Sequence, residues 1–244
     1  MKVTSHQNLG LVEPVRKSLF TCRFSQHINL LANQALASYP LYVLGGAVRD
    51  PIVTAKYGII VKTRDLDILV DDSQGKIDFR KSLRDIRNVQ YSTRLGSPRW
   101  TPDEGLEIDI IPFSLATKLR TDSSLPVSLA TTLQSCDFTT NAIAYGLRDN
   151  KVYSLGALEA IDKREVDLLH SEADRDYILM LRAVMLAKKL KFQIGQRMID
   201  LIVSEYSPDK DSSINEYMMY KKTAPMFEEV IRTLRQIKNQ FLSS

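Results

Sequence analysis

The spacing of apolar residues changes several times in the first quarter of the chain. Residues 14–38 carry apolar side chains at helical spacing and predict one or two helices. The run 41–44 (LYVL) is continuously apolar and predicts a short buried strand, while the segment 47–58 (AVRDPIVTAKYG) predicts a short helix. Two glycines, Gly45 and Gly46, therefore stand at a junction between a predicted strand and a predicted helix.

Acidic and apolar residues alternate in two of the next segments, as expected for strands with one polar face. These segments are 66–70 (LDILV) and 105–113 (GLEIDIIPF). Between them, 76–89 (KIDFRKSLRDIRNV) predicts an amphipathic helix. The polar segment 118–124 predicts a mobile connection, and 141–155 (NAIAYGLRDNKVYSL) predicts two strands joined by a turn at 148–150.

The pattern becomes helical from about residue 173 to the end of the chain. A polar stretch at 207–213 predicts a loop between helices. The helical periodicity extends over three segments: 177–192, 197–206 and 226–242. We therefore expect a mixed α/β domain over residues 1–170 and a helical domain over residues 171–244.

Composition narrows the class of protein. The chain has 244 residues, of which 44% are hydrophobic and 25% charged, so a packed core is expected. The formal charge of +4 is compatible with an anionic substrate but too small to indicate nucleic-acid binding by itself. Only two cysteines, Cys22 and Cys136, and three histidines are present, which argues against a Cys/His metal cluster.

No apolar run is long enough for a transmembrane helix, and the N-terminus has no apolar stretch typical of a signal peptide. The expected location is therefore the cytoplasm, without a membrane partner.

Carboxylates provide the strongest chemical signal. Residues two apart on a strand point to the same face, so Asp65 and Asp67 should project together and repel each other. A divalent cation would remove that repulsion, and Mg²⁺ prefers carboxylate oxygens. Glu107 and Asp109 repeat the spacing on another predicted strand, and one of them would complete a two-metal site. A solvated strand end is the alternative for Asp65 and Asp67 taken alone.

The glycine junction adds a second signal. A strand–Gly-Gly–helix turn lets backbone N–H groups approach phosphates closely, and the helix N-terminus adds positive potential. Arg49, one turn further along, is placed to reach the same anion. Because they lie between a strand and a helix and precede an acidic strand, Gly45 and Gly46 predict a phosphate-binding turn.

Three ordered segments carry a family resemblance. GGAVRD at 45–50, DLDILV at 65–70 and CDFTTNAIAY at 136–145 resemble signatures of class II CCA-adding tRNA nucleotidyltransferases and bacterial poly(A) polymerases. The likeness covers about residues 40 to 195. It implies an α+β fold, in which a polymerase-β-like nucleotidyltransferase head, a small mixed sheet flanked by helices, precedes an all-helical neck.

The resemblance also implies roles for individual residues. Asp65 and Asp67 would bind two Mg²⁺ ions, with Mn²⁺ as a substitute, and Asp109 is preferred to Glu107 as the third catalytic carboxylate. Arg49 and Asp50 would organise the glycine loop. Nucleotide binding is implied for eight positions: Gly45, Gly46, Arg49, Asp50, Asp137, Asn141, Asp176 and Arg182.

The sequence differs from the family at positions that bind the triphosphate and select the nucleobase. Two arginines of the family are replaced by Ser135 and Cys136, which removes positive charge expected near the triphosphate. Leu179 replaces an arginine that reads the nucleobase, and the chain stops soon after the neck. CCA addition is therefore disfavoured. The arginines that are candidates to supply the missing charge are Arg49, Arg64, Arg94 and Arg99.

The expected function is Mg²⁺-dependent transfer of a nucleoside monophosphate from an NTP, ATP or CTP first, to an acceptor hydroxyl. An RNA 3′ end is the first choice of acceptor, with a small molecule or a protein hydroxyl as alternatives. A nucleotide-binding or RNA-binding regulatory module on a degenerate scaffold is the second class of function. The oligomeric state stays open.

Overall fold

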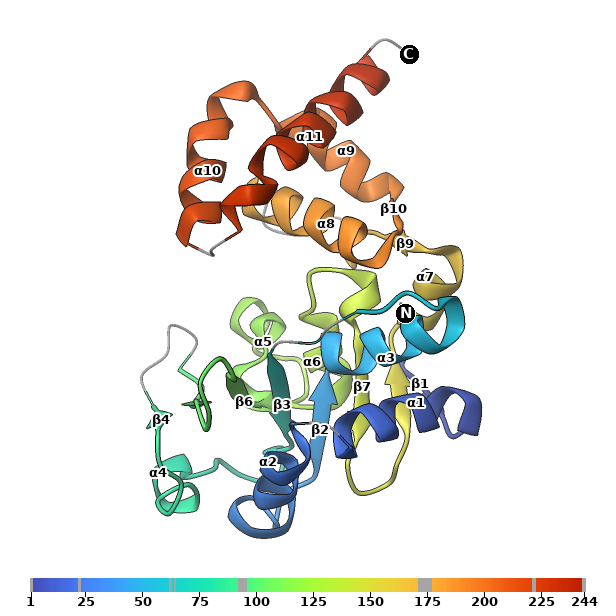
Figure 1. The fold of residues 1–244 in the computed structure, drawn as a ribbon. Helices are drawn as coiled ribbons and strands as arrows, with labels where there is room; N and C mark the ends of the chain where they lie inside the picture. Colours follow the sequence, from blue (N-terminus) through green and yellow to red (C-terminus); the bar gives the residue numbers. More distant parts are fainter. Residues whose placement is uncertain are drawn as a thin grey trace. The chain divides into compact units, whose positions relative to one another are not determined.

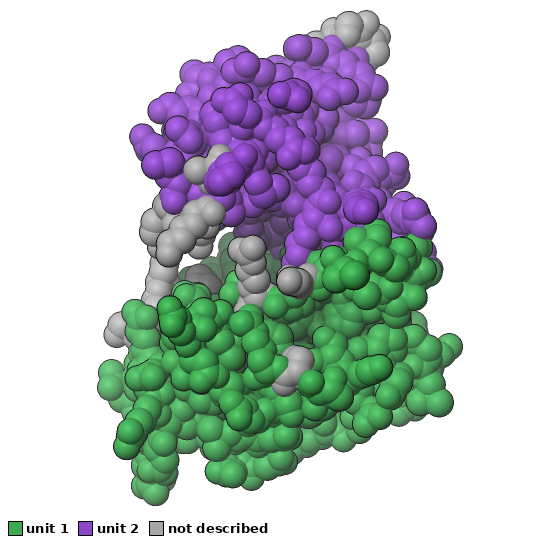
Figure 2. Space-filling view, viewed as in Figure 1, with its two compact units in different colours: residues 1–136, 141–158 green, residues 137–140, 159–244 purple. Residues whose placement is uncertain are grey.

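The computed structural model describes residues 2–21, 23–61, 63, 65–91, 96–170, 177–220 and 223–242. The chain divides into two compact units (Figure 2). Unit 1 comprises residues 1–136 and 141–158, and unit 2 comprises residues 137–140 and 159–244. The division thus falls earlier in the chain than residue 170, and the short segment 137–140 belongs to the second unit.

Unit 1 is built on a mixed sheet of eight strands (Figure 1). Its order is β1-β8-β7-β2-β3-β6-β5-β4, and β3 and β6 run parallel whereas the other neighbours run antiparallel. The strands are β1 (Thr4–His6), β2 (Leu41–Leu44), β3 (Leu66–Val70), β4 (Val89–Gln90), β5 (Arg99–Trp100), β6 (Ile108–Pro112), β7 (Ile143–Gly146) and β8 (Val152–Ser154).

Helices pack on this sheet and on each other. The central one is α3 (Gly46–Tyr57), which contacts β2, β3 and β7 and supports α1 (Leu9–Phe20). Its apolar face buries Val48, Ile52 and Val53. The remaining helices of this region are α2 (Ser25–Leu30), a π-helix (Leu31–Ala35), α4 (Phe79–Ser82), a 3₁₀-helix (Phe113–Leu115), α5 (Thr117–Thr121), α6 (Leu129–Gln134) and, across the boundary between the units, α7 (Ala157–Lys163).

The central strands of the sheet separate an apolar row from a polar row. Val43, Ile68 and Ile110 are neighbours in register on β2, β3 and β6, and all three are fully buried. Burying such a side chain contributes roughly 1.5–3 kcal/mol. Because side chains alternate along a strand, the adjacent residues Asp67 and Asp109 project to the opposite face. The core row therefore fixes where the carboxylates point.

Unit 2 is mainly a helical bundle of α8 (Tyr177–Leu190), α9 (Gln196–Glu205), α10 (Asp211–Tyr220) and α11 (Phe227–Leu242). Two 3₁₀-helices, Pro208–Lys210 and Ala224–Met226, connect them, and another, Thr139–Asn141, crosses the boundary between the units. A two-stranded parallel sheet of β9 (Glu165–Val166) and β10 (Gln193–Ile194) joins the start of the bundle. No helix among the described residues combines the length and apolarity needed to cross a bilayer.

Most of the expected elements are confirmed, including the helices in 14–38, the glycine junction and the strand pair in 141–155. Three expectations were wrong. The only helix in the segment 76–89 is the four-residue α4, because the segment buries just one residue fully, Leu83, and its Asn88 has a positive φ of 63°. The segment 118–124 contributes most of α5.

The third difference lies at 207–213. This stretch holds a 3₁₀-helix and the start of α10, which the buried side chains of Ile214 and Met218 attach to the bundle. Those two residues are four apart and lie on one face of the helix.

Candidate active site

Two carboxylates lie side by side on the sheet of unit 1. Asp67 on β3 and Asp109 on β6 are partners in register on parallel strands, and the two strands are about 4.8 Å apart by the geometry of any sheet. Residues in register point to the same face, so the two carboxylates share one face. Asp65 precedes β3 by one residue and is exposed, and alternation places it on the same side as Asp67.

The glycine junction lies next to this pair of strands. Leu44, the last residue of β2, is the register partner of Asp67, and Gly45 follows it directly. Gly45 has φ 64° and ψ −121°, a conformation that disfavours any residue with a Cβ. Its N–H donates to the carbonyl of Ile143, and its carbonyl accepts from Val48 and Arg49 at 3.0 and 2.8 Å. The turn therefore places the N-terminus of α3 beside the acidic strands.

Arg49 is held within the protein. Its side chain is buried, and its Nε and Nη2 donate to Asp50 Oδ1 at 2.8 and 2.5 Å. Its Nη1 donates to the side-chain oxygen of Asn141. Thr63 also donates to Asp50, at 3.4 Å. Arg49 and Asp50 therefore connect α3, the segment before β3 and the segment before β7. Contact of Arg49 with a phosphate stays a prediction.

A second arginine holds Asp109. Arg99 on β5 is the register partner of Asp109, and its Nε and Nη2 donate to Oδ1 and Oδ2 of that carboxylate at 2.7 and 2.9 Å. Its Nη1 lies 3.0 Å from Glu107. The hydrogen bond with Asp109 raises the pKa of Arg99 above its usual value, and the charges of Asp109, Glu107 and Asp65 add to that effect.

The donor set suits Mg²⁺ chemically, because Asp65, Asp67 and Asp109 supply hard carboxylate oxygens from one face of the sheet. In the part of the chain that the structure describes, however, no three His, Cys, Asp or Glu side chains are gathered closely enough to hold an ion. The bidentate contact with Arg99 occupies the carboxylate of Asp109. The residue types therefore suit the metal, and binding would require their side chains to move closer together, with Arg99 releasing Asp109.

Glu107 and Asp109 are now distinguishable as candidates for the third carboxylate. Glu107 precedes β6 and is exposed, whereas Asp109 lies within β6 directly beside Asp67. The register favours Asp109.

The remaining expected nucleotide contacts belong to unit 2 or lie outside the described residues. Arg182 on α8 forms an ion pair with Asp137, and its guanidinium carbon lies 5.7 Å from the centre of the Phe138 ring. Both charged side chains are partly exposed, whereas Leu179 is buried in the bundle. Asp176 lies outside the described residues. The structure thus brings Asp137 and Arg182 together within unit 2.

Ser135 and Cys136, which stand where the family has arginines, make local contacts. The Ser135 hydroxyl accepts from the N–H of Lys118 at 3.0 Å and donates to the carbonyl of Thr131 at 3.1 Å. The Cys136 thiol contacts the carbonyl of Asn141 at 3.5 Å. Ser135 therefore connects the end of α6 with α5, and Cys136 contacts the segment before β7.

Trp100 is buried against His27, with ring centres 5.1 Å apart and planes at 74°. This tryptophan therefore packs in the core of unit 1.

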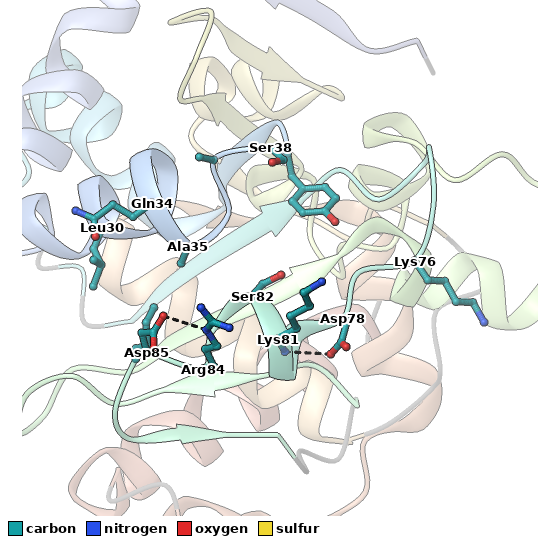
Figure 3. A pocket seen from close by; sticks show the side chains of 13 residues that line it. Leu30, Gln34, Ala35, Ser38, Lys76, Asp78, Lys81, Ser82, Arg84 and Asp85 are labelled. Atoms are coloured by element: carbon teal, nitrogen blue, oxygen red, sulfur yellow. Dashed lines mark hydrogen bonds and ion pairs between the residues drawn. The ribbon is translucent and has the colours of Figure 1, made fainter.

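A cavity of about 690 Å³ lies at the other end of β2, and Figure 3 shows the side chains that line it. It lies between the π-helix and the α4 region, near Ser38, before β2 begins, whereas Gly45 follows β2. Its acidic residues are engaged by their own segment, since Asp78 accepts from the Lys81 N–H and Asp85 from Arg84. None of the site carboxylates lines this cavity, so it is separate from the candidate active site.

Comparison with known proteins identifies the class of fold. No model of a known protein family matches the sequence, and no curated protein does. Solved structures of CCA-adding enzymes match the fold over most of this chain, which confirms the expected fold, a mixed sheet flanked by helices and followed by a helical region.

Three of these structures show the extent of the likeness. A CCA-adding enzyme solved with CTP matches 97% of this chain with a TM-score of 0.62 and 18% identity. The Thermotoga maritima CCA-adding enzyme in complex with a tRNA matches 91%, with a TM-score of 0.57 and 18% identity. A tRNA nucleotidyltransferase with a primer tRNA and an ATP analogue matches 83%, with a TM-score of 0.54 and 20% identity.

The chain spans 56, 55 and 58% of the lengths of these three proteins, a little over half in each case. The likeness therefore concerns the fold of the head and neck.

Sequence reasoning did not pair Arg99 with Asp109, although Arg99 was among the candidate cations. The available signal was weak: Arg99 and Trp100 form a two-residue strand, too short for alternation to be recognised. The pairing depends on the register of β5 against β6, which local patterns do not specify.

Proposed function

We propose that this protein transfers a nucleoside monophosphate from ATP or CTP to the 3′ hydroxyl of an RNA and releases pyrophosphate, with Mg²⁺ as its cofactor. The observation that carries this proposal is the register of Asp67 beside Asp109, next to the Gly45 turn. The shared fold supports it, because structures of that fold have been solved with CTP, ATP and tRNA.

In this reaction the acceptor oxygen forms a bond to the α-phosphorus, and the bond from that phosphorus to the β-bridging oxygen breaks. Asp65 and Asp67 would hold one ion, and Asp67 and Asp109 would hold a second. When bound, two such ions neutralise phosphate charge and lower the pKa of the acceptor hydroxyl. The acceptor proton leaves to solvent as the new bond forms.

The residues of the chain act mainly by positioning. The first N–H groups of α3 have no partner within the helix and would face the phosphates. Arg49 and Asp50 hold the turn that presents them, through Asn141. Asp137, Asp176 and Arg182 are proposed to contact the nucleotide, as the resemblance implies. Phosphoryl transfer needs positioning and charge neutralisation more than a covalent nucleophile, which suits this set of residues.

The test is transfer of α-labelled ATP or CTP to an RNA pool, with the same RNA oxidised at its 3′ ends as the acceptor control. We expect Asp67→Ala and Asp65→Ala to lower the rate at least about 100-fold. Asp85→Ala, an exposed carboxylate paired with Arg84, is the matched control and should keep the rate. Undiminished transfer by Asp67→Ala would contradict the assignment.

A second function, nucleotide binding without transfer, is favoured by one observation: Arg99 engages both oxygens of Asp109. Calorimetry with Mg²⁺ and ATP separates the two functions. Binding without label transfer to RNA, to small-molecule hydroxyls or to protein supports the regulatory module, and binding with transfer supports the enzyme.

A further inference from the structure

Arg99 makes three contacts with the acidic face of unit 1. Two of its nitrogens donate to the two oxygens of Asp109, and the third pairs with Glu107 at 3.0 Å. Planar guanidinium groups match carboxylates in this bidentate way, and such charge-assisted hydrogen bonds are stronger than neutral ones. Arg99 is therefore fixed on the carboxylate that the proposed reaction needs as a metal ligand.

Charge explains why an arginine is useful here. Asp65, Asp67 and Asp109 carry negative charge on one face of the sheet, and Glu107 adds a fourth carboxylate just before β6. Carboxylates at this spacing repel one another. The guanidinium of Arg99 neutralises part of that charge without any ion.

The backbone around Arg99 is anchored, while its side chain has access to solvent. Arg99 is paired with Gln90 on β4 and with Asp109 on β6, and the next residue, Trp100, is buried. The side chain of Arg99 is 38% exposed. The guanidinium can consequently leave Asp109 by side-chain rotation, without a change in the strands.

We propose that Arg99 is a positioning residue that stands in for the metal at Asp109 in the metal-free protein and leaves that carboxylate when the metal binds. This inference rests on the proposed function. A divalent ion on Asp109 would lie within a few ångströms of the guanidinium, and two cations at that separation repel. Bound metal and the Arg99–Asp109 contact therefore exclude each other.

Two measurable consequences follow. The contact lowers the apparent affinity for metal, because only molecules with Asp109 released can bind it. It also stabilises the metal-free protein, since removing Arg99 takes away the cation that pairs with Asp109 and Glu107. Arg99→Gln should therefore bind metal more tightly and unfold at a lower temperature when metal is absent.

The experiment is a titration with Mn²⁺ without nucleotide, followed by electron paramagnetic resonance of the free ion. We expect Arg99→Gln to bind Mn²⁺ about two- to five-fold more tightly than the native protein, the range expected for one partly exposed ion pair. Its unfolding temperature should be lower in EDTA and recover in Mn²⁺. Arg16→Gln is the matched control, because Arg16 makes an exposed bidentate contact with Glu13 at 2.9 and 3.0 Å.

A double-mutant cycle separates this role from a general effect of surface charge. In the Asp109→Asn background, Arg99→Gln should no longer improve Mn²⁺ binding, since there is no carboxylate left to release. A gain that persists in that background overturns the proposal. Arg99→Lys keeps the positive charge but loses the planar guanidinium that donates to both oxygens of Asp109, so it should give an intermediate affinity. It provides a second variant if Arg99→Gln does not fold.

Failure of this inference is distinguishable from failure of the proposed function. Equal Mn²⁺ affinity of the native and Arg99→Gln proteins, with label transfer intact, overturns the role of Arg99 alone. Absence of Mn²⁺ binding and of transfer in both proteins removes the proposed function and this inference with it.

Discussion

Arg49 and Asn141 are 92 positions apart in the chain, yet the guanidinium of Arg49 donates directly to the side-chain oxygen of Asn141. The same guanidinium donates twice to Asp50, and both charged side chains are almost fully buried. The contact connects the first turns of α3 with the segment before β7. Together with the hydrogen bond from the Gly45 N–H to the carbonyl of Ile143, it thereby holds the Gly45 turn against the start of β7.

Replacing Arg49 by methionine should destabilise unit 1 strongly. The change removes the cation but leaves Asp50 buried, and breaking a buried ion pair on one side costs about 3–5 kcal/mol. Chemical denaturation followed by the fluorescence of Trp100, the one tryptophan in the sequence, measures the loss. Arg16→Met removes an exposed ion pair and should cost less than about 1 kcal/mol. Equal losses in the two variants would contradict the structural role of Arg49.

A second prediction concerns the start of α9 in unit 2. Asp167 is buried, and its Oδ1 accepts from the N–H of Met198 at 2.9 Å, so it caps a helix from outside that helix. Gly195 lies directly against it: a Cβ on Gly195 would be 2.4 Å from the Cβ of Asp167. Gly195→Ala should therefore destabilise unit 2 by about 1–3 kcal/mol, the usual cost of overpacking.

Hydrogen exchange of the first amides of α9 reports this loss locally. The control is Gly75→Ala, because a Cβ there meets no atom within 4 Å, although its φ of 150° adds some backbone strain. Unchanged protection of the Met198 amide in Gly195→Ala would show that the helix start does not depend on this close contact.

The elements that sequence alone predicted are those with strong local signals. The run 41–44 is apolar and is followed by two glycines, as is typical of a short buried strand that ends in a turn. Leu66, Ile68 and Val70 lie two residues apart and are buried, as expected for one face of a strand. These patterns also place Asp67 on a polar face, so the position of that carboxylate followed from local reasoning.

The parts that sequence did not predict depend on contacts between distant segments. The segment 76–89 has helical periodicity, but only Leu83 is fully buried, so little apolar surface supports a longer helix. The Arg99–Asp109 contact depends on the register of β5 against β6. The contact between Arg49 and Asn141 joins residues 92 positions apart in the chain. Charged residues with several partners within reach cannot be paired from spacing alone.

Stability should fall at high pH through Tyr206. Burial, together with the hydrogen bond that Tyr206 donates to Asp211 at 2.7 Å, raises the pKa of this tyrosine to about 12. The unfolded chain loses the same proton near pH 10. Between these values the unfolded state binds fewer protons than the folded state, so the free energy of unfolding decreases as the pH rises, by about 1–2 kcal/mol in all.

Denaturant unfolding at pH 9, 10 and 11 measures this slope. Tyr206→Phe removes the ionisable group and should flatten it, after an initial loss of about 1 kcal/mol for the hydrogen bond. Tyr217→Phe, on the neighbouring α10, controls for other groups that titrate in this range. An unchanged slope in Tyr206→Phe would assign the pH dependence to a different group.

The two glycines of the phosphate turn should respond differently to alanine. Gly45 has φ 64° with ψ −121°, so alanine there would be strained by about 1–3 kcal/mol although the space for a Cβ exists, with Asn141 O 3.7 Å away. Gly46 begins α3, and a Cβ on it would meet Arg49 Nη2 at an ordinary 3.5 Å. Alanine at Gly46 should therefore leave stability unchanged or raise it by up to about 1 kcal/mol, because alanine favours the helix.

Denaturation of Gly45→Ala and Gly46→Ala gives the stabilities, and titration with Mg²⁺ and ATP gives the nucleotide affinities. In the proposed site, the Cβ of Gly46→Ala crowds the approach of a phosphate to the N-terminus of α3. This variant should therefore weaken ATP binding while remaining stable, a combination that general destabilisation does not produce. Full ATP affinity in a stable Gly46→Ala protein would place the phosphates away from this turn.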